Sequence, residues 1–248
     1  MLLRRAHRAV ALTGAGISTA SGIPDFRSPG SGLWEQRDPK AVASLVAFRH
    51  PPEDFYAWVR PLAEAVLCAK PNPAHLALAR LEARGLLDGL ITQNIDNLHQ
   101  KTGSRCVVEI DGHYRESTCM SCFQVYPTQA FFEAFVAEGG PPVCPRCGRH
   151  LKPNVVLFGE QLPWMEVRRA RELLACCDLI LVVGSSLGAT PVALFPLPAL
   201  DGGARLIIIK REPTFLDARA DARFYLDAAE ILPLLTTEAL DEQRTAAP

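Results

Sequence analysis

The stretch Leu179-Ile180-Leu181-Val182-Val183-Gly184-Ser185-Ser186 decides the fold class. Five aliphatic residues follow one another without polar alternation, and small residues come directly after them. A strand needs continuous hydrophobicity when helices cover both of its faces. Similar short aliphatic runs occur at residues 9–12, 90–92, 107–110 and 206–209. The sequence therefore predicts several buried, parallel strands.

Helical periods lie between these runs, at residues 74–84 and 164–175. Strands that alternate with helices are typical of α/β proteins. We therefore predict a Rossmann-like, doubly wound parallel sheet. In such sheets, ligands bind at the carboxyl ends of the strands.

Two segments interrupt the alternation. Residues 31–73 hold aromatic residues among prolines and predict a small helical insertion; residues 114–154 hold four cysteines. The aromatic residues are Trp34, Phe48, Phe55, Tyr56 and Trp58. We expect a sheet domain of residues 1–30, 76–113 and 155–248, and a smaller inserted domain, helical and zinc-binding, of residues 31–75 and 114–154. The cleft between them is the expected site.

Composition excludes several classes of protein. The 248 residues carry 26 basic and 27 acidic side chains, a formal net charge of −1. This balance argues against a nucleic-acid backbone as the main partner. The most apolar run is too short to span a bilayer, and the N-terminal residues form a poor signal-peptide core. We therefore expect no membrane partner and a cytoplasmic location, where paired cysteines more often hold metal than form disulfides.

The cysteines form two hooks, Cys119-x2-Cys122 and Cys144-x2-Cys147. Four thiolates complete a closed tetrahedral zinc site, which leaves no position for a reactive water. We therefore predict a structural zinc rather than a zinc hydrolase. A nucleic-acid zinc ribbon is the competing interpretation, but residues 114–152 hold only four Lys/Arg against three Asp/Glu.

Polar and glycine-rich turns follow three of the predicted strands. Gly14-Ala15-Gly16-Ile17-Ser18 lets the backbone approach a pyrophosphate, although Thr19 replaces the third glycine of the dehydrogenase fingerprint. No acidic residue ends a second strand about 20 residues on, which disfavours hydride transfer. Thr92-Gln93-Asn94-Ile95-Asp96 offers groups for sugar hydroxyls and ring amides, or an N-cap for the next helix. Gly184-Ser185-Ser186 likewise places small hydrogen-bond donors directly after a predicted strand.

Six motifs in order resemble the sirtuins, NAD-dependent protein deacylases, over about residues 10–235. These motifs are Gly14-Ala-Gly-Ile-Ser18, Gly22-Ile-Pro-Asp-Phe-Arg27, Thr92-Gln-Asn-Ile-Asp96, the two Cys hooks, Lys152-Pro-Asn-Val-Val-Leu-Phe-Gly-Glu160 and Val183-Gly-Ser-Ser186. The resemblance implies that NAD and an acyl-lysine peptide are consumed, with release of nicotinamide and O-acyl-ADP-ribose. Two alternatives remain open: a non-catalytic module that binds NAD and acyl-lysine peptides, and a mono-ADP-ribosyltransferase.

The resemblance also implies roles for particular residues. NAD would be bound by Gly14, Ala15, Gly16, Ser18, Thr19, Asp25, Phe26, Arg27, Gln93, Asn94, Asp96, Gly184, Ser185, Ser186, Lys210 and Ala228. Asn94 and Asp96 would also take part in catalysis. A substrate peptide would add as a strand between two edges, formed by Val156, Phe158, Gly159 and Glu160 and by Leu187 and Gly188.

The chain departs from the family where sirtuins carry a general-base His, because Asp111 stands there. A free Asp is a weaker base than His by about 2.6 pKa units, and it is shorter. An inactivating replacement is the favoured explanation. Asp111 acting as a slower base and rescue by His113 are the alternatives.

Two further departures concern the ligands. Lys210 stands where the family usually has an Asn that contacts the adenosine ribose; the Lys would attract phosphate or point to solvent. Sirtuins that remove acidic acyl groups carry a Tyr-x-x-Arg pair, whereas Val59 stands at the Arg position after Tyr56, and Arg60 follows it. We therefore expect neutral acyl groups, with acetyl first.

Overall fold

The computed structural model describes residues 2–28, 32, 33 and 38–245. Its larger sheet is six-stranded and wholly parallel, in the order β3-β2-β1-β7-β8-β9. The strands are β1 (Ala9–Thr13), β2 (Gly89–Thr92), β3 (Val107–Glu109), β7 (Leu179–Val183), β8 (Arg205–Ile209) and β9 (Ala222–Phe224). The predicted Rossmann-like sheet is thereby confirmed.

The strand order places a switch point between β1 and β7. The chain runs from β1 outward to β2 and β3, then returns to pair β7 with the other side of β1. Chain connections leave the sheet in opposite directions at such a point, and a crevice opens at the carboxyl ends of the two strands. The turns after β1 and β7 are therefore neighbours.

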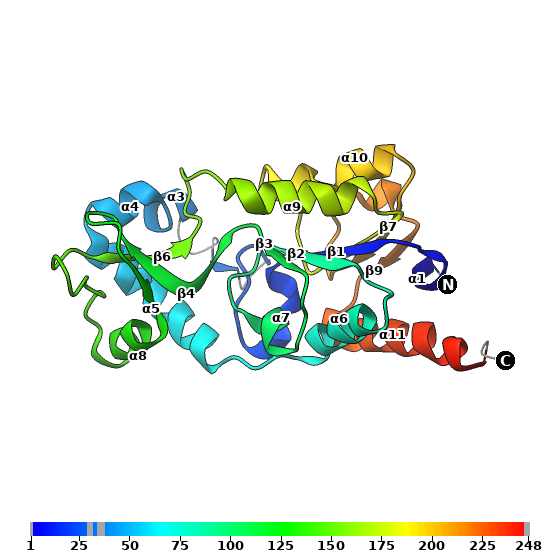
Figure 1. Cartoon of the computed structure of the whole chain (residues 1–248), viewed down its shortest axis with the longest axis horizontal. Coiled ribbons are helices and arrows are strands. Elements are labelled where there is room, and N and C mark those ends of the chain that lie inside the picture. The colour runs from blue at the N-terminus through cyan, green and yellow to red at the C-terminus, as the bar shows by residue number, and fades with distance from the viewer. Residues whose placement is uncertain (1, 29–31, 34–37, 246–248) are drawn as a thin grey trace.

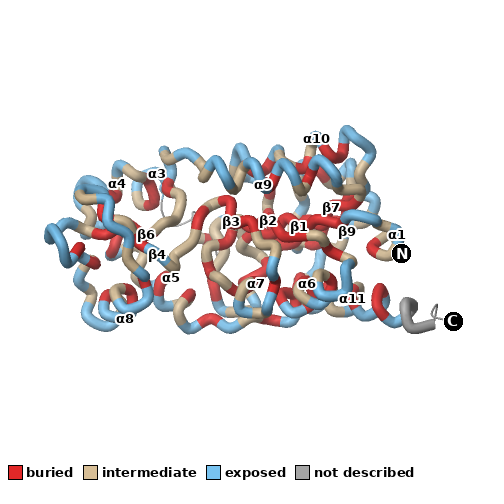
Figure 2. The backbone as a smooth tube through the Cα atoms, viewed as in Figure 1, coloured by how far each residue is buried: buried red, intermediate tan, exposed pale blue. Residues whose placement is uncertain are grey.

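Helices cover both faces of this sheet (Figure 1). One face packs on α1 (Leu2–Arg5), α6 (Pro73–Ala83) and α11 (Ala228–Thr245), and the other on α9 (Trp164–Ala175) and α10 (Pro196–Asp201). Alternate residues of one strand enter the two cores: Leu179 and Leu181 one, Ile180 and Val182 the other. The strands accordingly form the buried centre seen in Figure 2. Burial on both faces is the physical reason for their unbroken hydrophobicity.

A smaller unit lies beside one end of the large sheet (Figure 1). It contains helices α3 (Pro39–Val42), α4 (Leu45–Arg49), α5 (Pro52–Cys68) and α8 (Gln129–Glu138). Its antiparallel sheet has the order β5-β4-β6, from β5 (Val125–Pro127), β4 (Gly112–Cys119) and β6 (Leu151–Val155). Polar caps start two of the helices, since Asp38 accepts from the Lys40 amide and Ser44 from the Ala47 amide. Trp34 and the expected boundary at residues 30 and 31 lie outside the described residues.

The remaining elements are short. Helix α7 (Leu98–Lys101) follows β2, and 3-10 turns span Ala15–Ile17, Thr19–Ser21, Val192–Leu194 and Asp217–Arg219. Strand β9 and helix α11 were not predicted: β9 is three half-exposed or exposed residues long, and Pro233 interrupts the helical pattern of α11. Among the described residues, no helix is long and apolar enough to cross a membrane.

Candidate functional site

A cavity of about 890 Å³ opens at the switch point and extends into the smaller unit. Every residue predicted to bind NAD lines it, and so does Asp111. Val156, Phe158, Gly159 and Glu160 also line it, whereas Leu187 and Gly188 are not among the described lining residues. The carboxyl ends of parallel strands thus bring together motifs that are far apart in the sequence.

Close packing of the turns after β1 and β7 explains the glycines there. The Gly16 amide donates to the Gly184 carbonyl at 2.9 Å. A Cβ on Gly16 would lie 2.8 Å from that carbonyl oxygen, and Gly184 has a φ of +65°. The sequence pattern predicted an approach to a pyrophosphate, but the structure shows that these glycines first permit the approach of two turns. Only short 3-10 turns follow Gly14.

The turn after β7 places Leu187, which was predicted to contact substrate, in a core rather than in the cavity. Ser185 donates to the Gln93 side chain at 2.7 Å and accepts from the Leu187 amide at 3.2 Å. Leu187 is 4% exposed and belongs to the core on the α9 side of the sheet. Gly188 lies against Arg27, because its Cβ would be 3.4 Å from the Arg27 Nε. Ser185 therefore links the turn after β7 to the turn after β2, where Gln93 lies.

A buried polar cluster forms the cavity floor. Ser18 donates to Asp96 at 2.6 Å and accepts from the Asn94 side-chain amide at 3.1 Å. The ring of His75 lies 3.4 Å from the Ser18 hydroxyl, and its centroid is 5.0 Å from that of His99, with the two ring planes tilted at 57°. Burial raises the pKa of Asp96 and lowers that of His75 to about 4 and that of His99 to about 3. Both rings are therefore neutral at pH 7, and the cluster orients Asn94 and Asp96 without adding positive charge.

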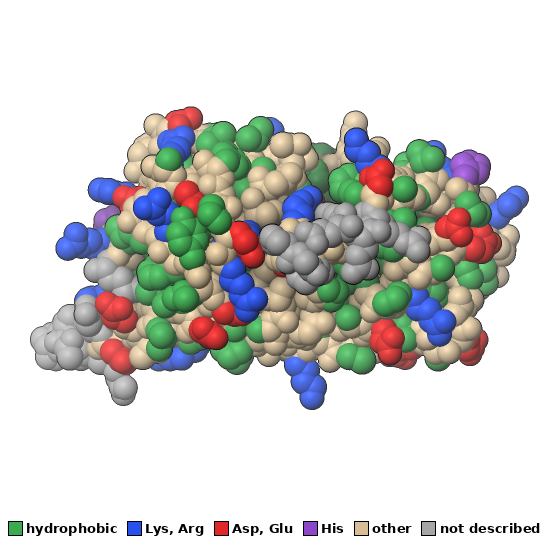
Figure 3. Space-filling view, turned by 180° about the vertical axis from the view of Figure 1, so that it is seen from behind, with side chains coloured by type: hydrophobic (Ala, Val, Ile, Leu, Met, Phe, Trp, Pro, Cys, Tyr) green, Lys and Arg blue, Asp and Glu red, His purple; other side chains and the backbone are tan. Residues whose placement is uncertain are grey.

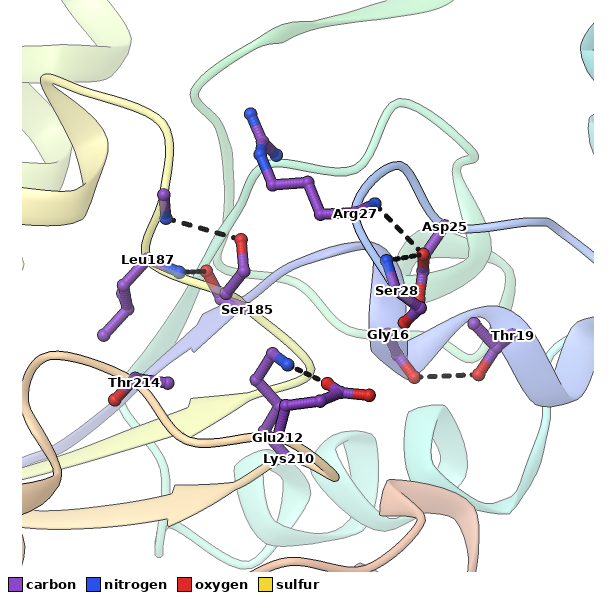
Figure 4. A network of polar contacts seen from close by, with 12 residues as sticks. Gly16, Thr19, Asp25, Arg27, Ser28, Ser185, Leu187, Lys210, Glu212 and Thr214 are labelled. Atoms are coloured by element: carbon purple, nitrogen blue, oxygen red, sulfur yellow. Dashed lines mark hydrogen bonds and ion pairs between the residues drawn. The ribbon is translucent and has the colours of Figure 1, made fainter. Parts of the chain in front are cut away.

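The loop after the glycine turn is held by Asp25 (Figure 4). Its carboxylate accepts from the amides of Arg27 at 3.2 Å and Ser28 at 2.9 Å, and from the Ser28 hydroxyl. The Arg27 guanidinium lines the cavity, where burial lowers its pKa while Asp111 and Asp25 raise it. Arg27 thus places a positive charge in the cavity near Asp111.

Asp111 follows β3 after one turn residue, Ile110, and lies at the junction of the two units. Its carbonyl accepts from the Val156 amide at 2.8 Å. Gly112 must follow, because its φ is +79° and a Cβ would lie 2.2 Å from the Asn154 carbonyl oxygen. Burial raises the pKa of Asp111 to about 6, and Arg27 partly opposes that rise. The difference in basicity from a free His, about 2.6 units in solution, becomes small inside this cavity.

His113 does not replace Asp111 geometrically. It is not among the described lining residues of the cavity, and its Nδ1 is buried without a partner. Burial and the nearby Arg115 lower its pKa. Nothing in this arrangement supports His113 as the base.

Lys210, after β8, meets Glu212 at the cavity wall (Figure 4). The Lys210 ammonium donates to the Glu212 carboxylate, and only 13% of the Lys210 side chain is exposed. Of the two expectations, pointing to solvent is therefore wrong. Glu212 was not predicted as a site residue, although an acid two residues from an unusual Lys is a signal for an ion pair.

The loop between β6 and α9 is built around Lys152. Its ammonium donates to the carbonyls of Pro153 at 3.1 Å and Val155 at 2.8 Å, and forms an ion pair with Glu160 at 2.9 Å. Glu160 also accepts from the Leu157 amide at 2.8 Å. This buried ion pair therefore closes residues 153–160 into a ring.

The same loop is joined to the helical insert by backbone pairing. The Phe158 amide donates to the Ala43 carbonyl, and the Leu45 amide donates to the Phe158 carbonyl, both at 3.0 Å. The predicted substrate edge therefore has fixed contacts on its α3–α4 side.

One face of α5 forms an apolar wall of the cavity, which the sequence analysis did not anticipate. Its residues recur at helical spacing: Phe55, Val59, Leu62, Ala63 and Val66. This spacing was a readable signal of one apolar face, but a core face and a cavity wall look alike in sequence.

The four cysteines of the two hooks lie together, with their sulfur atoms within 4.8 Å of one another. Cys119 and Cys147 sulfurs are 3.4 Å apart, and those of Cys122 and Cys144 are 3.6 Å apart. These separations are far longer than a disulfide bond of about 2.05 Å. They are near the sulfur–sulfur separation of about 3.8 Å expected when four thiolates bind one zinc tetrahedrally at about 2.3 Å. The cluster therefore fits a closed zinc site.

Comparisons with known proteins agree with this arrangement. The sequence model of the Sir2 family matches residues 14–191. A protein of Caldivirga maquilingensis, named NAD-dependent protein deacetylase, is 47% identical over 238 residues, which are 96% of this chain and 91% of that protein.

Solved Sir2 structures are similar over nearly the whole chain. One concerned with the mechanism and regulation of Sir2 enzymes has a TM-score of 0.91 and 42% identity, over 97% of this chain and 95% of that one. Another, a Sir2 variant with a deacetylated p53 peptide and 3′-O-acetyl ADP-ribose, has a TM-score of 0.90 and 38% identity, over 96% and 95% of the two chains. This chain therefore belongs to the Sir2 family.

Proposed function

We propose that this chain is an NAD-dependent protein-lysine deacylase. It would convert an acyl-lysine, NAD and water into lysine, nicotinamide and O-acyl-ADP-ribose. One observation carries the proposal: a single cavity is lined by the strand-end turns, by Asp111 and by the apolar face of α5. The related deacetylase and the Sir2 structure with deacetylated peptide and acetyl ADP-ribose support it.

The cavity fits NAD as the co-substrate. Its volume of about 890 Å³ lies in the upper part of the range of ligand sites, about 300–1,000 Å³. Gly14–Gly16 and Gly184–Ser186 would lie along the phosphates and adenosine, and Gln93, Asn94 and Asp96 would surround the nicotinamide ribose. NAD supplies the ADP-ribosyl group that receives the acyl group. Asp25, Phe26 and Arg27 would cover the nicotinamide end.

Asp111 is proposed as the base that accepts a proton from a ribose hydroxyl. A base works best when its pKa lies close to the operating pH. With a pKa of about 6, the half-buried Asp111 is ionised at pH 7 yet far more basic than an exposed Asp. Arg27 would hold the carboxylate in place by its charge. This favours a working enzyme over the inactivating replacement expected from the sequence alone.

We propose that an acyl-lysine peptide adds as a strand between residues 156–160 and residues 186–188. The division into a sheet domain (1–30, 76–113, 155–248) and a small domain (31–75, 114–154) would place this groove where the two meet. A structural zinc on the four cysteines would stabilise the small domain, and thiolates of this kind suit the reducing cytoplasm. Basic and acidic side chains are interspersed on the face in Figure 3, so no nucleic-acid partner is proposed.

The experiment is a mass balance with the full chain, NAD and an acetyl-lysine peptide. Nicotinamide, deacetylated peptide and O-acetyl-ADP-ribose are expected to form in equal amounts. Binding of NAD and peptide without nicotinamide release would instead identify a non-catalytic module. Label from the ADP-ribose part of NAD retained on protein would identify an ADP-ribosyltransferase. Either result would refute the proposal.

A further inference from the structure

A second hollow, of about 660 Å³, lies along α9. Trp164, Arg168, Arg171 and Ala175 line it, and their spacing of three or four residues places them on one face of the helix. Eleven residue steps on a helix rise by about 16 Å, which is the length of about five residues of extended chain. This α9 hollow is therefore long enough to hold a short peptide segment.

The α9 hollow adjoins the cavity at the end of the proposed substrate edge. Leu162 and Val167 line both the hollow and the cavity. Only residues 161–163 separate Glu160, the last residue of that edge, from Trp164, the first of α9. Figure 1 shows that α9 begins next to the smaller unit. A peptide strand that runs along the edge and continues past Glu160 would therefore enter the hollow.

The entrance of the hollow carries a large exposed aromatic side chain. Trp164 is 70% exposed, and Figure 2 shows exposed residues along much of α9. Trp and Arg are the residue types most enriched at the energetic centres of protein interfaces. Trp164 together with the arginines of α9 therefore suits contact with another polypeptide.

The charges of α9 leave one cation available at the hollow. Arg168 forms an ion pair with Glu172 at 2.7 Å, and Arg169 forms one with Glu166 at 3.0 Å. Arg171 has neither an ion pair nor a hydrogen bond to any described residue, and it is exposed. A guanidinium binds a carboxylate through two parallel hydrogen bonds. The charge of the hollow therefore complements an acidic segment.

We propose that the α9 hollow binds the part of a substrate protein that flanks the acyl-lysine, and that it selects an acidic segment with an apolar residue. This rests on the deacylase function proposed above and names the sequence class of its substrates. Seven helical steps from Trp164 to Arg171 rise by about 10 Å, which is about three residues of extended chain. The apolar residue and the carboxylate should accordingly stand about three positions apart.

The test measures binding, which does not depend on turnover. Fluorescent acetyl-lysine peptides carry, on one side or the other, an extension with Phe and Asp at that spacing or a Gly/Ser extension of equal length. They are titrated with the full chain and followed by anisotropy. We expect the Phe/Asp extension on one side to tighten binding at least fivefold over its Gly/Ser match, and high salt to reduce this gain.

Variants of α9 assign the gain to the hollow. Arg171→Glu should abolish it and should instead favour a peptide with Lys in place of the Asp. Trp164→Ala should reduce the gain by removing the contact with the Phe. Arg80→Glu is the charge-matched control, because Arg80 is exposed on α6, on the opposite face of the large sheet, and this variant should keep the gain. All three positions are exposed, where substitutions usually change stability little.

The outcomes separate this inference from the proposed function. Equal binding of the Phe/Asp and Gly/Ser peptides, with acetyl-lysine turnover intact, overturns the α9 docking surface and leaves the deacylase. A gain that Arg171→Glu abolishes, without turnover of any peptide, supports the docking surface and refutes the deacylase. A gain that survives both Arg171→Glu and Trp164→Ala also overturns the inference.

Discussion

Asp111 is a half-buried carboxyl group whose replacement by Asn tests the electrostatics of the cavity in two ways. Asn keeps the shape of Asp but cannot ionise, so Asp111→Asn removes a charge and a base together. Burial makes the ionised form unfavourable, and Arg27 offsets this only in part. We therefore expect the variant to be more stable at neutral pH and less active.

The sign of the stability effect follows from the pKa. Asp111 has a pKa of about 6 in the folded chain, above about 3.9 when unfolded, so the folded chain binds its proton more tightly. Its ionisation therefore lowers the free energy of unfolding as pH rises through the window from about 4 to 6. The shift corresponds to at most about 3 kcal/mol at pH 7 and about 1.5 kcal/mol at pH 5. Asp111→Asn should add these amounts to the free energy of unfolding.

Denaturant unfolding at the two pH values, with zinc present, measures this difference. In the parent enzyme, kcat/KM should rise with pH up to about 6 and then stay level, and Asp111→Asn should lower it by about 10²–10⁴-fold. Glu64→Gln, exposed on α5, is the control for loss of one carboxylate. Two results would refute the reasoning. Asp111→Asn could be less stable than its parent at pH 7, or it could be more stable by the same amount at pH 5 and at pH 7.

Three other predictions concern separate parts of the chain. Cys144→Ser removes one of four thiolates, so zinc content measured by atomic absorption should fall and Tm should drop; full zinc with an unchanged Tm would rule out this ligand set. Lys210→Asn leaves the Glu212 carboxylate unpaired at the cavity wall, so calorimetry should show NAD binding weakened about three- to tenfold. The double variant that also carries Glu212→Gln should recover the NAD affinity. Unchanged NAD affinity in the single variant would remove any role for the pair. Lys152→Met breaks the ion pair with Glu160 inside the substrate loop, so the KM for peptide should rise more than kcat falls, while NAD affinity stays within about twofold. Lys152→Arg keeps the positive charge and should recover part of the loss. An equal loss of NAD affinity would argue against a local effect.

Local pattern was sufficient for five strands of the large sheet and for the two cysteine hooks. The five aliphatic runs became β1, β2, β3, β7 and β8, because a strand covered on both faces needs hydrophobic side chains throughout. The Cys-x2-Cys hooks met because each hook spans only one turn of chain, and strands β4 and β6 bring the two hooks together. Strand β9 and helix α11 lacked such a pattern, since β9 is a short, half-exposed edge and Pro233 breaks the period of α11.

The chemistry of the site depended on contacts between distant segments. From the sequence, Asp111 was a weak base; its environment, made by residues far along the chain, moves its pKa toward that of His. Lys210 had two expected orientations, and only its pairing with Glu212 selected one. Leu187 follows two cavity residues directly, yet its side chain is in the core.

The sequence alone determined the fold class, the four cysteines that cluster and the motifs that meet at the sheet edge, because these are encoded by residue type and spacing over a few positions. Only the tertiary structure decided how basic Asp111 is, where Lys210 points, and that the apolar face of α5 lines a cavity rather than a closed core. Burial, local charge and empty space are properties of segments brought together by folding, and no short stretch of sequence contains them.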